Sequence, residues 1–211
     1  MKPNLKPSRY PSRASEDSAL IREVLDAGLF CTVAFVREGI AHQIPTGYCH
    51  DDSYLYIHAA AKSGFLDSIV GQTVSFSVTL MDGIVLSHSA FDSSFNYRSV
   101  VGFAVAEEVS DPAEKLEMFK VFTDRYVPGR IADVGDPLPE QVAITRIMKL
   151  SLDHAAVKLR RGDVNVAHLD KYDKWCGVVP VRQSYGHPEI DNQIKGKVEL
   201  PDYIAKLVNM K

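Results

Sequence analysis

The stretch HQIPTGYCHDDSYLYIHAAAKSGFL, residues 42–66, decides the fold that the sequence predicts. Its first part favours a β-strand but contains Pro45, which cannot donate a backbone hydrogen bond, and Gly47, which tolerates close approach of another group. This strand is therefore expected at a sheet edge, or bulged at the proline. Residues 51–53 have the composition of a turn, and residues 54–58 alternate as a second strand should. The stretch predicts two antiparallel strands, the first with exposed backbone groups.

Small residues and one lysine follow the second predicted strand, in the run AAAKSG at 59–64. The alanines leave room for a ligand close to the backbone, and Ser63 can cap a helix that runs to about Val70. The free N–H groups of such a helix, with Lys62 beside them, suit a phosphate. The exposed backbone near Pro45 suits a planar ring with donors and acceptors, such as a flavin. An ordinary hairpin followed by a capped surface helix explains the same residues equally well.

Composition and charge limit the class of protein. The 211 residues suit one large domain, and 45% hydrophobic and 9% aromatic residues are typical of a soluble globular protein. The net charge of −3, without a basic cluster, argues against nucleic acid as a partner. No apolar run approaches the roughly 20 residues that span a bilayer, and the basic N-terminus lacks the apolar run of a secretory signal. Three distant cysteines without a CxxC pair fit a reducing compartment, so we expect a cytoplasmic protein.

Turn residues and alternating patterns divide the rest of the chain into short elements. We expect a helix over 15–27, capped by Ser15, and a second helix opened by Asp111 and Pro112. Strands are expected at 29–36, 73–80, 84–88, 96–109, 145–152 and 155–161, with residues 81–83 (Met-Asp-Gly) as a hairpin turn. Residues 130–140 are expected to form a loop, and the chain from Gly162 onward is expected to be irregular.

This series predicts a mainly β fold with helices, an antiparallel barrel in a single domain. About seven strands joined mostly by hairpins favour a barrel over a doubly wound sheet, and no G-x-G-x-x-G follows a strand. We expect an N-terminal arm over 1–14, the barrel domain over 15–181 and a C-terminal extension over 182–211. His42, His50 and His58 form no HxH or HExxH pair, so no metal site is expected.

Taken in order, the motifs of the chain resemble those of the FMN-binding split-barrel family related to pyridoxamine 5′-phosphate oxidase, especially its flavin-nucleotide-binding branch. The resemblance covers residues 9–181. It rests on RYPSR at 9–13, IPTGY at 44–48, LYIHAAAKS at 55–63, VTLMDGIVLSHSAF at 78–91, NYRSVVGFA at 96–104, DPAEKL at 111–116, and AAVKLRRG at 155–162 before Trp175. Each motif is weak alone, but their order and spacing together are specific.

The resemblance implies a homodimer of split β-barrels with FMN bound at the subunit interface. It implies that the ring lies along Ile44, Pro45 and Thr46, and that the phosphate and ribityl chain are held by His58, Ala60, Lys62 and Ser63. It further implies that Asn96, Tyr97, Arg98 and Ser99 reach the site from the partner or border the phosphate, with Lys158, Arg160 and Trp175 nearby. The fork of Arg98 suits a phosphate, and Trp175 suits a lid over the ring.

One position departs from the family. Relatives carry an arginine directly after the serine that matches Ser63, whereas this chain has Gly64, so a phosphate contact is lost and Lys62 is the candidate to replace it. Several candidates also have ordinary structural explanations. His58 can be a packed histidine, Tyr97 and Arg98 a cross-strand pair, Trp175 a core or interface residue, and Arg160 part of a solvated surface.

These features favour an FMN-dependent oxidoreductase, in which the flavin accepts hydride and the protein supplies orientation and substrate choice. No acid or base in the sequence stands out as catalytic, and the substrate is not predicted. A binding module that stores, senses or carries a flavin is the alternative, and haem binding is a third possibility because seven histidines are available. Arg182 and His187 match the substrate-gripping residues of pyridoxamine phosphate oxidase only loosely, so that activity is not expected.

Overall fold

The computed structural model of the protein describes residues 5, 10–164 and 174–209, which form nine strands and six α-helices. The strands are β1 (Ala14–Ser15), β2 (Phe30–Arg37), β3 (Ile40–His50), β4 (Tyr54–Ala60), β5 (Thr73–Leu86), β6 (Ser94–Glu108), β7 (Thr145–Ser151), β8 (Ala155–Arg160) and β9 (Gly177–Pro180). The helices are α1 (Ser18–Ala27), α2 (Gly64–Ile69), α3 (Pro112–Tyr126), α4 (Arg130–Val134), α5 (Pro139–Ala143) and α6 (Asp202–Asn209), with a 3-10 helix, η1 (Pro11–Arg13), before β1.

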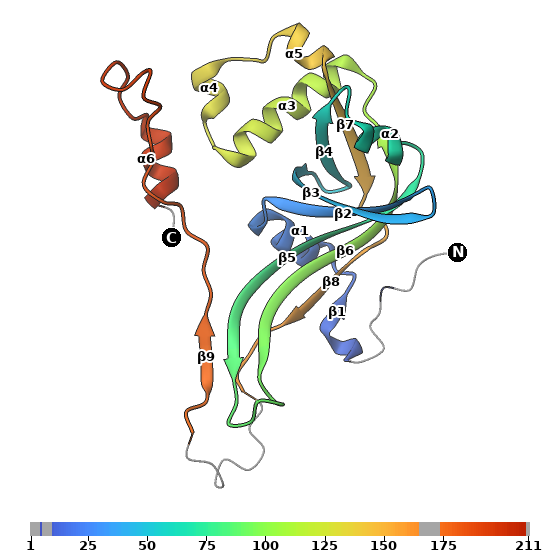
Figure 1. Cartoon of the computed structure of the whole chain (residues 1–211), viewed down its shortest axis with the longest axis vertical. Helices are drawn as coiled ribbons and strands as arrows, with labels where there is room; N and C mark the ends of the chain where they lie inside the picture. Colours follow the sequence, from blue (N-terminus) through green and yellow to red (C-terminus); the bar gives the residue numbers. More distant parts are fainter. Residues whose placement is uncertain (1–4, 6–9, 165–173, 210–211) are drawn as a thin grey trace. The chain divides into compact units, whose positions relative to one another are not determined.

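Six of the strands close into a ring, in the order β6–β5–β2–β3–β4–β7 and back to β6 (Figure 1). Each neighbouring pair in this ring is antiparallel. The long strands β5 and β6 run on beyond the ring, where β8 and then β1 extend the sheet from β6, and β9 pairs with β5. The predicted fold class, a mainly β antiparallel barrel with helices, is confirmed.

The core fills the ring because strand residues point alternately inward and outward. On β5, for example, Val74, Phe76 and Val78 are buried while the residues between them are partly exposed. Helix α1 adds Ile21, Val24 and Leu25 to the same core. Burying each such side chain contributes about 1.5–3 kcal/mol. The hydroxyl of Tyr48, on β3, donates to the backbone carbonyl of Leu25 at 2.6 Å, so the helix is also held by a buried hydrogen bond.

Helix α1 begins later than predicted, and a different residue caps it. The side chain of Asp17 accepts from the backbone N–H groups of Ala19 and Leu20. Ser15, the predicted cap, instead pairs with Val157 in the β1–β8 ladder, and its hydroxyl accepts from the Asp17 N–H at 3.1 Å. Both residue types cap helices well, and the strand pairing of Ser15 leaves the position to Asp17.

The hairpin predicted at residues 81–83 does not exist. Strand β5 is continuous from Thr73 to Leu86, and its register against β6 only shifts between Met81 and Gly83, as in a β-bulge. The Asp-Gly pair favours a turn by composition, but the side chain of Asp82 binds Arg98 on the neighbouring strand instead. The turn between β5 and β6 falls later, in the loop 87–93.

The chain divides into two compact groups of residues, 1–109 with 145–182, and 110–144 with 183–211. The first holds all nine strands, so the candidate site is described within it alone. The second holds α3, whose predicted cap Asp111 is confirmed, and three elements that the sequence did not predict: α4 and α5 in the expected loop, and α6 in the expected irregular tail. Strand β9 was also missed. Tyr203 of α6 donates to Asp133 of α4 at 2.7 Å and accepts from Arg130.

Among the described residues, no helix is long and apolar enough to cross a membrane. The predicted N-terminal arm falls largely on residues 1–4 and 6–9, which lie outside the described residues. Arg9 of the RYPSR motif is among them.

Candidate functional site

Strands β3 and β4 pair for only part of their length and then separate. Their ladder joins Tyr48 to Ile57 and ends there, although β3 extends back to Ile40 and β4 runs on to Ala60. Over the separated part, β3 pairs only with β2, and β4 pairs only with β7. If the register continued, Pro45 would stand opposite Ala60. The result is a split in the barrel wall with a strand edge on each side, which we call the β3–β4 split.

The first edge of the split is the segment of β3 around Pro45. Pro45 pairs with Thr32 of β2 on one side and is exposed, so the prediction that its strand has an unpaired edge is confirmed. Its neighbours Ile44 and Thr46 point to the less exposed face, and Ile44 packs against the core. Backbone groups along this edge have no ladder partner on β4, so they are available to a ligand.

The second edge is the end of β4 and the bend that follows it. Ala59 and Ala60 close the strand, the Ser63 N–H donates to the Ala60 carbonyl at 2.8 Å, and α2 begins at Gly64. Ser63 occupies the predicted N-cap position, but its side chain makes no capping bond. Its hydroxyl is therefore not committed to α2. Lys62 is exposed beside it.

Gly64 is not required by the backbone. A Cβ built at this position meets no atom within 4 Å, and its φ lies outside the left-handed region that favours glycine. The side chain missing here therefore leaves open space at the start of α2, where the resemblance implies an arginine in relatives.

His58 lies on β4 beside the split and pairs with Ile147 of β7 in the ladder. Burial lowers the pKa of His58 from its ordinary value of 6.5, since the charged imidazolium is the form that loses most solvation. The imidazole is therefore uncharged at neutral pH.

A second group of the predicted residues lies on β6 and β8. The register pairs Tyr97 with Arg160 and Ser99 with Lys158, so these four side chains share one face of the ladder. Lys158 Nζ lies 6.0 Å from the centre of the Tyr97 ring, and the Ser99 hydroxyl donates to the Lys158 carbonyl at 3.2 Å. We call this the β6–β8 face.

The cations of the β6–β8 face are not neutralised by nearby acids. Arg160 donates to the side-chain oxygen of Asn96, whose amide donates to the Gly162 carbonyl at 2.9 Å. Neither Lys158 nor Arg160 forms an ion pair with a carboxylate of the described residues. The face therefore suits an anion.

Arg98 does not belong to this face, which revises the prediction that it holds a phosphate. Alternation along β6 places it on the opposite side from Tyr97 and Ser99. Its guanidinium donates twice to Asp82, with Nε and Nη2 both 2.9 Å from a carboxylate oxygen, and lies 3.6 Å from Glu23 of α1. These carboxylates raise its pKa, chiefly through the hydrogen bond to Asp82. The planar guanidinium, whose geometry would suit a phosphate, is thus already bound to Asp82 of the same chain.

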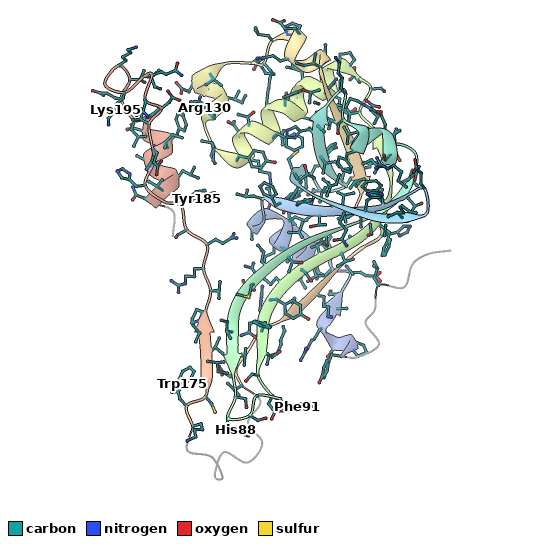
Figure 2. All side chains as sticks on the ribbon, viewed as in Figure 1. His88, Phe91, Arg130, Trp175, Tyr185 and Lys195 are labelled. Atoms are coloured by element: carbon teal, nitrogen blue, oxygen red, sulfur yellow. The ribbon has the colours of Figure 1, made fainter. Side chains whose placement is uncertain are left out.

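Trp175 lies away from the split within one chain. Figure 2 shows it with His88 and Phe91 at the far end of the β5–β6 hairpin, where β9 joins β5. Its ring covers Gly177, where an added Cβ would come within 2.8 Å of the indole, yet 66% of Trp175 is exposed, as is 91% of Phe91. The expected role as a lid over the ring stays a prediction that requires a second copy of the chain.

A cavity of about 260 Å³ lies elsewhere, between α1 and the turns after β3 and β7. Two of its acidic residues, Asp51 and Asp52, already have partners. Asp52 pairs with Arg22 at 2.6 Å, and Asp51 accepts from Ser53, Tyr54 and Tyr56. Burial raises the pKa of Asp51, but these hydrogen bonds outweigh it and the net shift is downward. The cavity lacks the open backbone edges of the split, and no group of metal-ligating side chains occurs among the described residues.

One residue at the split was missed by the sequence analysis. Arg146 of β7 stands opposite Ala59 of β4 and binds two carboxylates, Glu108 of β6 and Asp67 of α2. These partners lie 38 and 79 residues from it in sequence, so no local motif reveals the cluster.

Comparisons with known proteins agree with this geometry. The model of the pyridoxamine 5′-phosphate oxidase family matches residues 17–159, and a search of curated protein sequences found no match. Among solved structures, the chain is similar to the flavocytochrome Anf3 from Azotobacter vinelandii, with 28% identity over 95% of this chain and 94% of that one and a TM-score of 0.88. It is also similar to the FAD and haem binding protein from Mycobacterium smegmatis, with 30% identity over 93% and 97% and a TM-score of 0.87. A proposed 5-nitroimidazole antibiotic resistance protein from Bacteroides thetaiotaomicron shares the fold at 17% identity, covering 69% and 85% with a TM-score of 0.56.

Proposed function

The chain belongs to the pyridoxamine 5′-phosphate oxidase family of split barrels, and from this premise we propose that it is a flavin-dependent oxidoreductase that binds its flavin in the β3–β4 split. The observation that carries the proposal is the separation of β3 from β4 after Tyr48 and Ile57. It leaves two strand edges opposite each other, one interrupted by Pro45 and one built from alanines.

The residues of the split fit a flavin. The edge at Ile44, Pro45 and Thr46 offers backbone groups to the polar rim of the ring, while Ala60 leaves room for the ribityl chain. Lys62 and the uncommitted hydroxyl of Ser63 suit the phosphate end. When bound, the flavin would accept and release electrons, while the chain binds it, orients it and limits access of water.

We propose that the site is completed in a homodimer. The cationic β6–β8 face lies on strands that are not neighbours of β3, and the face has no ion-pair partner among the described residues. A second copy that brings this face, with Lys158, Arg160 and Trp175, to the split would supply the positive charge that Gly64 does not. Exposed Trp175 and Phe91 would then be covered.

The form of the flavin is a separate question. The sequence motifs favour FMN, whereas the Mycobacterium smegmatis relative is named for FAD. The open space at Gly64 is compatible with a longer, dinucleotide flavin, because an added Cβ there meets no atom within 4 Å. Heat release of the bound flavin, chromatography, and treatment with phosphodiesterase distinguish FMN from FAD.

The visible spectrum of the purified protein tests flavin binding. We expect the two absorption bands of an oxidised flavin, either as purified or after addition of FMN or FAD. A colourless protein that takes up neither would refute the proposal. Anaerobic mixing with NADH or NADPH then separates an oxidoreductase from a carrier or sensor. Bleaching within seconds supports the enzyme, and no reduction over hours supports the binding module.

Haem as a second cofactor is the other candidate. It is favoured by the two relatives that cover more than nine tenths of both chains, since one is named a flavocytochrome and the other an FAD and haem binding protein. Both ring nitrogens of His50 already face oxygens, of Asp26 at 2.9 Å and Asp51 at 3.2 Å, so His50 is unsuited to bind iron. Protein expressed with a supply of haem tests this candidate. A Soret band in its absorption spectrum would support haem binding, and the absence of that band would refute it.

A further inference from the structure

We propose that Arg146 is a positioning residue for the flavin site, because it fastens α2 and the bend at 60–63 to the barrel. This inference rests on the proposed function. The three residues concerned, Arg146, Glu108 and Asp67, are named here the Arg146 clamp.

The clamp joins three elements. Arg146 donates through Nε and Nη2 to the two carboxylate oxygens of Glu108, both at 2.8 Å, in a bidentate pair. Its third nitrogen, Nη1, donates to Asp67 at 2.5 Å. The Arg146 side chain is 17% exposed and that of Glu108 is 34% exposed, whereas that of Asp67 is 67% exposed, so solvent screens the Glu108 pair less than the Asp67 pair. Glu108 ends β6, Asp67 lies in the first turn of α2, and Arg146 itself is on β7.

The clamp adds a polar link at the first turn of α2, where Phe65 and Leu66 also pack against the core. Beyond the C-terminal end of α2, the Gly71 N–H donates to the Ala106 carbonyl at 2.8 Å, and the Ala106 N–H donates to Gln72 at 3.0 Å. At the N-terminal end, the Ser63 N–H donates to the carbonyl of Ala60, the last residue of β4, at 2.8 Å. Among the described residues, the side-chain hydrogen bonds from α2 to the sheet are Asp67 to Arg146 and a long contact of Arg37 with Ser68 at 3.5 Å.

The clamp also lies directly behind the split. Arg146 pairs with Ala59, one residue before Ala60, and Asp67 follows Ser63 by one helical turn. The segment 59–63 is thus held between a strand and a helix that the same guanidinium connects. Loss of the clamp frees this segment, so that a flavin would have to order it on binding, and binding would weaken.

A purely electrostatic role for Arg146 predicts a different flavin affinity for the Asp67 variant than the clamp does, and this makes the proposal testable. If Arg146 acted only by neutralising Asp67 near an anionic ligand, then Asp67→Asn would leave flavin binding unchanged or tighten it. In the clamp, Asp67→Asn replaces a charge-assisted hydrogen bond to α2 with a weaker one, so it weakens binding in the same direction as Arg146→Ala. The double variant should bind no more weakly than Arg146→Ala, because both changes break the same link.

The experiment compares the wild-type chain, Arg146→Ala, Asp67→Asn, the double variant and Arg146→Lys. Hydrogen exchange of residues 60–70 is measured in flavin-free protein, and the flavin dissociation constant and the visible circular dichroism of bound flavin are measured by titration. We expect faster exchange and about three- to tenfold weaker binding in the first two single variants. Arg146→Lys should recover part of the affinity, since a lysine can keep one of the two carboxylates. Arg22→Ala is the control, because it breaks a more exposed arginine–aspartate pair of 2.6 Å that joins α1 to the turn between β3 and β4.

Unchanged exchange in Arg146→Ala overturns the clamp, and faster exchange with unchanged affinity and dichroism overturns its role in positioning flavin. Tighter binding by Asp67→Asn also overturns it, in favour of charge alone. If the wild-type chain binds no flavin, the proposed function fails together with the positioning role. The exchange data then still show whether the clamp itself holds α2.

Discussion

Asp82 and Arg98 form a bidentate ion pair across neighbouring strands, with the guanidinium Nε and Nη2 each 2.9 Å from a carboxylate oxygen. The aspartate sits in the bulge of β5, where the sequence suggests a turn, and the arginine lies where the sequence suggests a phosphate ligand. The pair therefore accounts for two departures from the sequence analysis.

From this pair we predict that Asp82→Asn and Arg98→Ala act on stability. The pair is partly buried, with 21% of the Arg98 side chain and 31% of the Asp82 side chain exposed, so removing one partner leaves a charge poorly solvated. We expect a loss of about 1–3 kcal/mol, seen as a lower thermal midpoint. Arg161→Ala, which removes a more exposed partner of Glu23, should change the midpoint less. Loss of flavin from Arg98→Ala without a change in the thermal midpoint would contradict the structural role assigned to Arg98.

Two glycines form a matched pair for a packing prediction. A Cβ at Gly102 would lie 2.2 Å from the buried ring of Phe76, so Gly102→Ala forces this ring to move and should cost about 1–3 kcal/mol. A Cβ at Gly64 meets nothing, so Gly64→Ala should leave stability unchanged or raise it slightly. Urea denaturation of both variants measures the difference, and equal midpoints would count against the described core.

Restoring the arginine that relatives carry should tighten flavin binding. Gly64→Arg places a guanidinium beside Lys62 and Ser63, where a charge-assisted hydrogen bond to phosphate is worth about 1.5–3 kcal/mol, or roughly a tenfold to hundredfold change in the dissociation constant for FMN. Gly64→Ala is the control for the loss of glycine alone. Identical FMN affinities in the two variants would show that the phosphate does not lie at the start of α2.

The stability of the protein should fall in mild acid because of His58. Its pKa is lowered in the folded chain by burial, so the unfolded chain takes up the proton at higher pH. The resulting contribution to the free energy of unfolding is complete above the ordinary pKa of 6.5 and is lost as pH falls through the folded pKa. Between about pH 8 and 5, the thermal midpoint should fall less steeply with decreasing pH in His58→Gln than in the wild-type chain.

Mixed subunits test whether the site is shared between two chains. Ala60→Trp should fill the split, and the double change Lys158→Glu with Arg160→Glu should reverse the charge of the β6–β8 face. We expect each variant alone to lose flavin. A heterodimer purified through two different affinity tags has one intact split facing one intact β6–β8 face, so it should bind one flavin. A heterodimer without flavin would mean that both groups act within one chain.

The sequence predicted what depends on local patterns and missed what depends on distant partners. Alternation on β4 and β5, the proline in β3 and the small residues at 59–61 were sufficient to predict antiparallel strands, an open edge and a bend. The turn at Asp82 was predicted wrongly because its true partner, Arg98, lies 16 residues away on another strand. Arg146 was missed for the same reason, and α6 because its docking residue, Tyr203, bonds to a helix about 70 residues earlier.

The position of Pro45 also bears on how the protein avoids self-association through its strands. The outermost strands of the sheet, β1 and β9, have only two and four residues, so they offer little to an incoming strand. The long unpaired stretch is the edge of β3 at the split. A proline in the middle of it interrupts the row of donors that an invading chain would need, so Pro45 disfavours amyloid-like pairing at this open edge before any ligand arrives.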